Sequence, residues 1–96
     1  MSELPTEAEI AKVLRTYLRG DRLTAMPRRG RKRQIVLEHL VQRFEPGRRY
    51  SEVEVNELLR AVWTDVAALR RYLVDTSLLA RSGGEYWRIG GRVDVG

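Results

Sequence analysis

The 96-residue chain contains no cysteine and only one histidine, His39. The missing cysteines exclude disulfides and thiolate metal sites, and a lone histidine offers no recognisable metal-ligand spacing. Glu38, its neighbour, projects from a different side of the expected helix, so the two residues form no catalytic pair. No glycine-rich phosphate loop precedes a lysine. We therefore expect no metal, no cofactor, no small-molecule ligand and no enzymatic activity.

Long apolar segments are also missing. No run approaches the roughly 20 apolar residues of a membrane-spanning helix, and the acidic start at residues 1–5 lacks the apolar stretch of a signal peptide. The composition, 43% hydrophobic and 32% charged, is typical of a soluble globular domain. We predict one cytoplasmic domain with a modest core and no membrane contact.

Acidic residues are the minority among the charges. The chain has 18 lysines and arginines but only 13 aspartates and glutamates, which gives a net charge of +5. This charge suits a polyanionic partner. Only Lys12 and Lys32 are lysines, and the arginine fork matches phosphate groups and guanine edges. Codon bias in a GC-rich genome would produce the same excess of arginine, so composition alone does not establish binding.

Helical periodicity predicts an N-terminal helix over residues 6–19. It opens with a capping box formed by Thr6 and Glu9. The apolar stripe that follows is Ile10, Val13, Leu14, Tyr17 and Leu18. We expect this stripe to pack within the chain. The alternative is that a homodimer forms through it. Residues 20–30 are predicted to form an ordered basic loop.

The remaining pattern, over residues 31–89, predicts three helices, a short strand and a hairpin. In chain order these are helix 31–44, strand 48–50, helix 52–62, helix 65–76, and hairpin strands 79–81 and 85–89. This order is typical of a winged helix-turn-helix. The expected fold class is therefore mainly α with a small β-hairpin (α+β), with an added N-terminal helix and a flexible tail at 90–96.

Local signals support the second half of this pattern. Ser51 and Glu54 form a capping box at the start of the helix 52–62, and Tyr50 and Val55 occupy hydrophobic-staple positions. The pair Gly83-Gly84 supplies the positive φ angles that a two-residue hairpin turn requires.

The basic run Arg28-Arg29-Gly30-Arg31-Lys32-Arg33 is the strongest charge feature, with no acidic residue between Arg22 and Leu37. At the start of a helix such cations can contact a phosphate backbone, and the helix dipole adds to the attraction. The same charges oppose the dipole, at a cost of a few tenths of a kcal/mol, which indicates a role beyond folding. A solvated loop without a partner is the alternative.

The helix 65–76 is the candidate recognition helix. Its inward residues are Val66, Leu69 and Leu73, and its outward side carries Arg71 with Thr64, Ala68 and Asp75. Arg70 lies nearer the core edge and is expected to pair with a carboxylate of the preceding helix, such as Glu57. Arg71 is therefore the predicted nucleic-acid contact, although Asp75 would repel phosphate.

The hairpin adds two further cations, Arg81 and Arg88, which a wing can lay along a groove. The aromatic residues Trp87, Trp63 and Phe44 are expected to anchor the core rather than stack on bases. The residues predicted to contact nucleic acid are therefore Arg28, Arg29, Arg31, Lys32, Arg33, Thr64, Arg71, Arg81 and Arg88.

Several segments together resemble a known family. The segments GDRLTAMP, FEPGRRYSEVEVNELL, DVAALRRYLVDTSLLAR and GEYWR, within residues 17–89, are similar to the bacterial domain of unknown function twenty eighty-seven. Its members are usually described as transcriptional regulators, and some resemble fusions in which this domain follows a separate winged helix of the ArsR type. On matching positions the resemblance implies roles for the basic run, Tyr50, Glu54, Asn56, Leu69, Arg70, Arg71 and Trp87.

The sequence thus predicts a winged-helix transcriptional regulator that binds double-stranded DNA. The basic run and the wing are expected to contact the phosphates. Because the sequence begins with Met1, we expect no upstream DNA-binding domain, whereas in fused relatives this domain would be the effector or dimerisation half. A winged-helix module for protein interaction or dimerisation in the transcription machinery is therefore the first alternative. RNA binding is the second.

Overall fold

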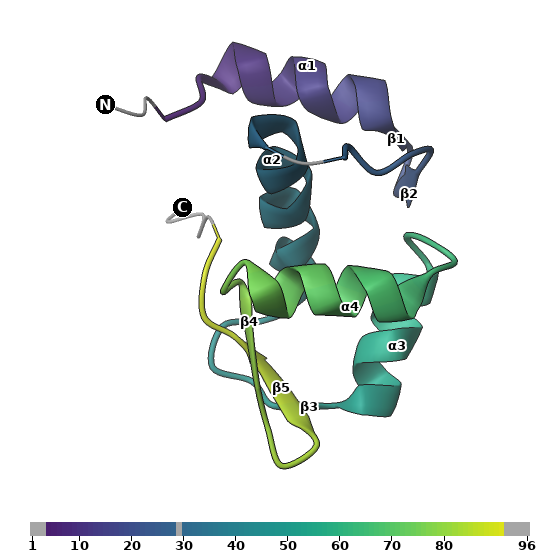
Figure 1. The fold of residues 1–96 in the computed structure, drawn as a ribbon, viewed down its shortest axis with the longest axis vertical. Helices are drawn as coiled ribbons and strands as arrows, with labels where there is room; N and C mark the ends of the chain where they lie inside the picture. The colour runs from purple at the N-terminus through teal and green to yellow at the C-terminus, as the bar shows by residue number, and fades with distance from the viewer. Residues whose placement is uncertain (1–3, 29, 92–96) are drawn as a thin grey trace.

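The computed structural model describes residues 4–28 and 30–91, which form four α-helices, one short 3-10 helix and two small antiparallel sheets (Figure 1). The elements are α1 (Glu7–Tyr17), β1 (Leu18–Arg19), β2 (Arg22–Leu23), α2 (Arg31–Leu40), η1 (Val41–Arg43), β3 (Tyr50–Ser51), α3 (Glu52–Arg60), α4 (Val66–Asp75), β4 (Leu79–Ser82) and β5 (Glu85–Arg88). The predicted α+β class is confirmed, and each predicted helix and hairpin strand has a counterpart.

The first sheet, β1–β2, was not predicted. The expected helix over residues 6–19 ends two residues early, and the expected loop 20–30 contributes a strand to this hairpin. Gly20 turns the chain with a φ of +63°. Leu23 is buried, and its N–H donates a hydrogen bond of 2.9 Å to the carbonyl of Val62, just beyond α3. The helix stops early because this long-range contact holds the second strand in place.

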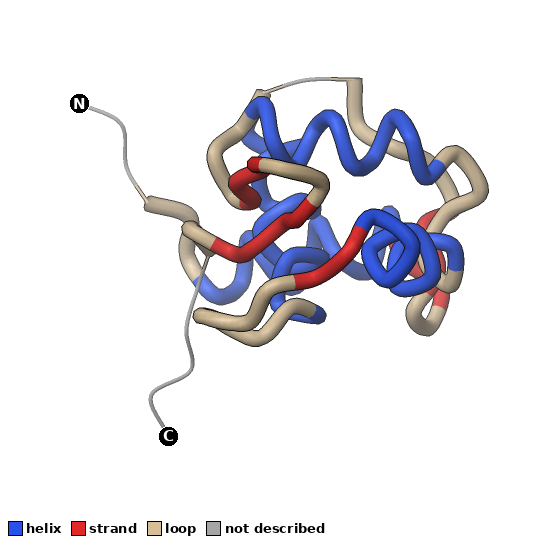
Figure 2. Tube along the Cα trace, turned by 90° about the horizontal axis from the view of Figure 1, so that it is seen from below, coloured by secondary structure: helices blue, strands red, loops and turns tan. Residues whose placement is uncertain are grey.

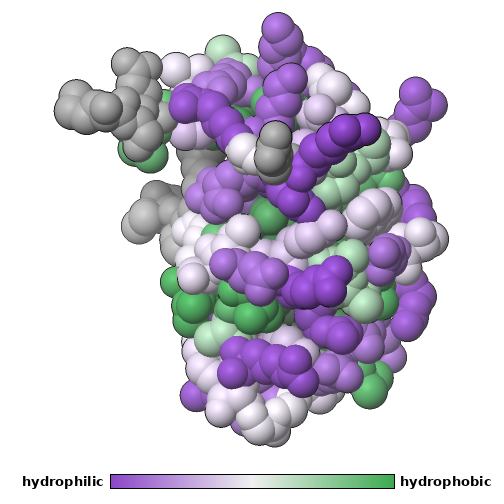
Figure 3. Space-filling view, viewed as in Figure 1, coloured by the Kyte–Doolittle hydropathy of each residue, from purple (hydrophilic) through white to green (hydrophobic). Residues whose placement is uncertain are grey.

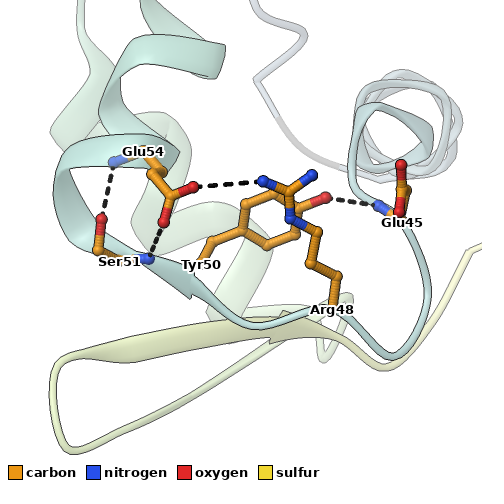
Figure 4. Close-up of polar contacts among 5 residues, drawn as sticks. All are labelled: Glu45, Arg48, Tyr50, Ser51 and Glu54. Carbon is orange, nitrogen blue, oxygen red and sulfur yellow. Dashed lines mark hydrogen bonds and ion pairs between the residues drawn. The ribbon is translucent and has the colours of Figure 1, made fainter.

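The start of α3 is built by the capping box that the sequence predicts (Figure 4). Ser51 Oγ accepts from the Glu54 N–H at 3.2 Å, and a Glu54 carboxylate oxygen accepts from the Ser51 N–H at 3.0 Å. The other Glu54 oxygen lies 3.4 Å from Arg48 Nη2. The Tyr50 hydroxyl accepts from the Glu45 N–H at 2.8 Å. These contacts fix the loop before β3 and so set the direction of α3.

The second sheet has the strand order β3-β5-β4. The strands β4 and β5 form the predicted hairpin, and Gly83 and Gly84 turn it with φ values of +58° and +80°. The short strand β3 adds to the far side of β5, with Tyr50 opposite Tyr86. Figure 1 places this sheet at the end of the helical body opposite α1, and Figure 2 looks onto it from that end.

The core lies between the second sheet and the helices α2, α3 and α4. Its fully buried side chains include Val36, Leu37, Leu40, Val41, Phe44, Val55, Leu59, Val62, Leu69 and Leu73. The helix α1 lies across the start of α2 and packs there through Val13, with Ile10 and Tyr17 partly buried, so its stripe does pack within the chain. This packing leaves α4 on one face of the molecule, directly above the hairpin.

Candidate nucleic-acid interface

A shallow groove of about 340 Å³ lies between α4 and the β4–β5 hairpin. It is lined by Ala67, Arg70, Arg71, Val74, Asp75, Arg81 and Tyr86. The five residues from α4 recur at the spacing of one helical face, so a single stripe of the helix faces the groove. The hairpin supplies the other wall, with Arg81 from β4 and Tyr86 from β5.

The two exposed cations of this groove come from elements that are separated in the chain. Arg71 is exposed and makes no hydrogen bond or ion pair with any other described residue. Arg81 is also exposed, and its guanidinium carbon lies 5.6 Å from the centroid of the Tyr86 ring. The predicted outward direction of Arg71 is therefore confirmed. Whether Arg71 contacts nucleic acid stays a prediction.

A polar network fixes the position of the groove walls. Arg70 turns back toward α3, where it donates to Asn56 Oδ1 and where its Nη2 lies 3.9 Å from Glu52 Oε1. The Tyr86 hydroxyl donates to the same Glu52 oxygen at 2.9 Å. Burial, and then this hydrogen bond, raise the pKa of Tyr86 above its usual value. Arg70 thus pairs with a carboxylate of α3 as expected, but the partner is Glu52 at the helix start rather than Glu57.

Two other residues predicted on the outward side of α4 lie elsewhere. Ala68 is buried, because the outward stripe runs through positions 67, 71 and 75 and the next residue turns toward the core. Thr64 is exposed but does not line the groove. It precedes Asp65, whose carboxylate caps α4 by accepting from the Ala68 N–H at 3.1 Å.

The structure divides the basic run. Arg31 donates from Nε and Nη2 to the two carboxylate oxygens of Glu9 in α1, at 2.6 and 2.9 Å, and this contact lowers the pKa of Glu9. The guanidinium carbon of Arg33 lies 3.7 Å from the centroid of the Tyr72 ring in α4, and its Nη1 donates to the Arg28 carbonyl at 2.7 Å. Both side chains thus join helices in the folded chain, and whether Arg31 or Arg33 also contacts a phosphate backbone stays a prediction.

Three described cations of the run are exposed, and Arg29 lies outside the described residues. Arg31 pairs with Glu9, whereas the side chains of Arg28 and Lys32 make no hydrogen bond or ion pair with a described residue. Both lie at or just before the start of α2, the end of that helix that packs on α1. Figure 3 shows hydrophilic side chains (purple) over much of the face that carries α4.

Arg88 does not lie on the surface of the β4–β5 hairpin. Only 9% of it is exposed, and it donates from Nη1 to the Phe44 carbonyl at 3.2 Å and from Nε to the Gly90 carbonyl at 2.9 Å. Side chains alternate along a strand, and Arg88 shares the inner face of β5 with the buried Tyr86. The prediction of an exposed contact residue was therefore wrong.

The outer face of the second sheet carries a contact that sequence reasoning missed. The guanidinium carbon of Arg49 lies 3.7 Å from the centroid of the Trp87 ring. The two residues meet because β3 pairs with β5, and the only signal in the sequence was their shared position beside predicted strands. Of the three predicted aromatic anchors, Phe44 is fully buried, whereas Trp63 and Trp87 are only half-buried.

The described residues hold no group of three or more metal-ligating side chains, and none of their helices is long and apolar enough to cross a membrane. His39 lies partly exposed on α2, where partial burial and then Arg43 lower its pKa.

One comparison with known proteins gives a match. The model of the bacterial family described as "Uncharacterized protein conserved in bacteria (DUF2087)" matches residues 22–88. The matched segment runs from β2 to β5 and includes both walls of the groove. No curated protein and no solved structure matches the chain.

Proposed function

The chain belongs to this family of conserved bacterial proteins, and we propose that it is a winged-helix protein that binds double-stranded DNA as a transcriptional regulator. The observation that carries the proposal is the groove in which the exposed Arg71 of α4 and Arg81 of β4 lie together.

The order of the elements supports the winged-helix assignment. From α2 onward the chain runs helix, strand, helix, helix, strand, strand, and the short strand β3 joins the hairpin to give the order β3-β5-β4. The helices α3 and α4 are separated by only five residues, 61–65, as in a helix-turn-helix. In that motif the second helix enters the major groove, and here the second helix is α4.

The exposed cations fit contact with a duplex on this face. Arg71 extends from the middle of α4 toward the DNA, and Arg81 on the wing contacts the flanking backbone. Arg28 and Lys32, exposed at the start of α2, are two further cations for phosphate contacts. Phosphate contacts position a protein on DNA without reading its sequence. Four neutralised phosphates would make log K fall with log salt with a slope of about −4.

Fluorescence anisotropy with a labelled random duplex tests the proposal. Wild-type protein should bind at about 10 μM or below at low salt, and the affinity should fall steeply between about 50 and 200 mM salt. The double variant R71A/R81A should bind more weakly, with a slope shallower by about 2. The control R15A/R60A removes two exposed arginines that do not line the groove. It lowers the net charge by the same amount as R71A/R81A.

Two results would contradict the proposal. One is equal binding by R71A/R81A and R15A/R60A, since the loss would then reflect net charge alone. The other is no binding by wild-type protein near 10 μM at low salt, which lies within the range of ordinary non-specific DNA affinity, about 10⁻⁴ to 10⁻⁶ M. The same titration with an RNA duplex of equal sequence separates the two nucleic acids, because A-form RNA does not admit a helix into its major groove.

A protein-interaction or dimerisation module is the second candidate. It is favoured by the internal contacts of Arg31, Arg33 and Arg88, and by Asp75, which lies among the arginines of the groove. This function predicts no affinity for either duplex. It also predicts a molar mass above that of the monomer in sedimentation experiments, or capture of a protein partner by the folded chain.

A further inference from the structure

One row of the groove-facing helix presents three different chemistries. Ala67, Arg71 and Asp75 follow one another at intervals of four residues on α4, and all three are exposed and line the groove. Ala67 offers a methyl group, Arg71 a planar fork of donors, and Asp75 two acceptor oxygens. A helix that only held a phosphate backbone would carry cations along this row.

Asp75 has no evident role in holding the fold. It is the last residue of α4, where a negative charge opposes the helix dipole and destabilises the helix. An arginine four residues before an aspartate is also the less favourable order for a helical ion pair. Within the described part of the chain, the Asp75 carboxylate lies within 4.0 Å of no arginine, although three arginines line the same groove.

We infer that Arg71 and Asp75 act as a donor–acceptor pair that reads G·C base pairs, which makes Asp75 a specificity-determining residue. The inference rests on the proposed function, since it needs α4 in the major groove. At a matching site the Arg71 fork donates to guanine O6 and N7 in place of the phosphate that it contacts on a random duplex, and the Asp75 carboxylate accepts from the N4 amino group of cytosine.

The helical spacing assigns the two contacts to different base pairs. Four residues advance the helix by about 6 Å, and neighbouring base pairs are about 3.4 Å apart. A helix that runs along the groove therefore brings Arg71 and Asp75 to positions about two steps apart.

A role in base reading also explains why an acidic residue occupies this unfavourable position at the end of α4. Facing thymine O4 or guanine O6, Asp75 would meet another acceptor, and beside phosphates it is repelled. It therefore lowers the affinity for wrong sites more than for the right one, which is how a repulsive element produces specificity. A good contact of this kind gives about 5- to 150-fold discrimination against the wrong base.

Selection from a random duplex library, followed by anisotropy on the enriched and base-shuffled duplexes, tests the inference. Wild-type protein should enrich a motif that contains G·C pairs. D75N should change the preference at one position from cytosine to adenine, because an asparagine amide pairs with adenine N6 and N7. R71K keeps the charge but loses the bidentate fork, so it should flatten the preference for guanine at a nearby position. E57Q, an exposed acidic residue outside the groove, is the matched charge control.

The outcomes separate the inference from the function on which it rests. A shift at one position in D75N, absent from E57Q, supports the inference. A uniform gain of affinity for all sequences in both variants overturns it and leaves DNA binding intact, as does wild-type binding with no enriched motif. If wild-type protein binds no duplex near 10 μM at low salt, within the range of ordinary non-specific affinity, the proposed function fails and the inference fails with it.

Discussion

Replacing Arg88 with alanine should destabilise the protein strongly, although no exposed cation is lost. The side chain is 9% exposed, and it donates hydrogen bonds to the Phe44 carbonyl, just after η1, and to the Gly90 carbonyl, just after β5. Alanine removes both donors and leaves the Phe44 carbonyl without this partner in the core.

The size of the effect follows from these contacts. A hydrogen bond from a charged group contributes about 1.5–3 kcal/mol, so the loss of two should lower the free energy of unfolding by about 3–6 kcal/mol. A domain of this length has a total of about 5–14 kcal/mol. At about 4–8 °C per kcal/mol for a domain of up to 100 residues, the melting temperature should fall by at least about 12 °C.

Urea and thermal unfolding followed by circular dichroism measure this change. R88M keeps an apolar stem and loses the donors, so it separates hydrogen bonding from packing. DNA affinity, measured well below the melting temperature of R88A, should equal that of the wild type. A loss below about 1 kcal/mol, the value of one ordinary hydrogen bond, together with weaker DNA binding, would refute the burial of Arg88 and restore it as a contact residue.

Two further predictions concern the start of α3 and the fall of the free energy of unfolding at low pH. S51A should lower the free energy of unfolding by about 1 kcal/mol, because it removes the Ser51 hydroxyl of the capping box. An unchanged urea midpoint would show that this hydroxyl does not cap α3. The pKa values of Glu9 and Glu54 are lowered from about 4.5, by Arg31 and by the Ser51 backbone N–H respectively. Because the pKa is lower in the folded state, this stabilisation is complete above about pH 4.5 and is lost as the pH falls through the folded values. E9Q and R31A should therefore each weaken the acid dependence in a pH titration of unfolding, and curves that superimpose on the wild type would show that the ion pair does not form in solution.

The sequence by itself specified the features whose causes are local. The capping box of Ser51 and Glu54, the Gly83-Gly84 turn and the apolar stripes each depend on residues a few positions apart. Their order along the chain was enough to predict the helices from α2 onward and the β4–β5 hairpin. The outward direction of Arg71 followed in the same way, because a helix of known inward residues has a known outward side.

Only the tertiary structure decided which cations are used inside the fold. Arg31 meets Glu9 across 22 positions, and Arg88 meets the Phe44 carbonyl across 44. The β1–β2 hairpin likewise depends on the distant Val62 carbonyl. A long arginine side chain reaches whichever acceptor or ring the packing of other elements brings near, and no local pattern encodes that neighbour. The sequence therefore showed where positive charge is dense, and the fold left Arg71, Arg81, Arg28 and Lys32 facing solvent.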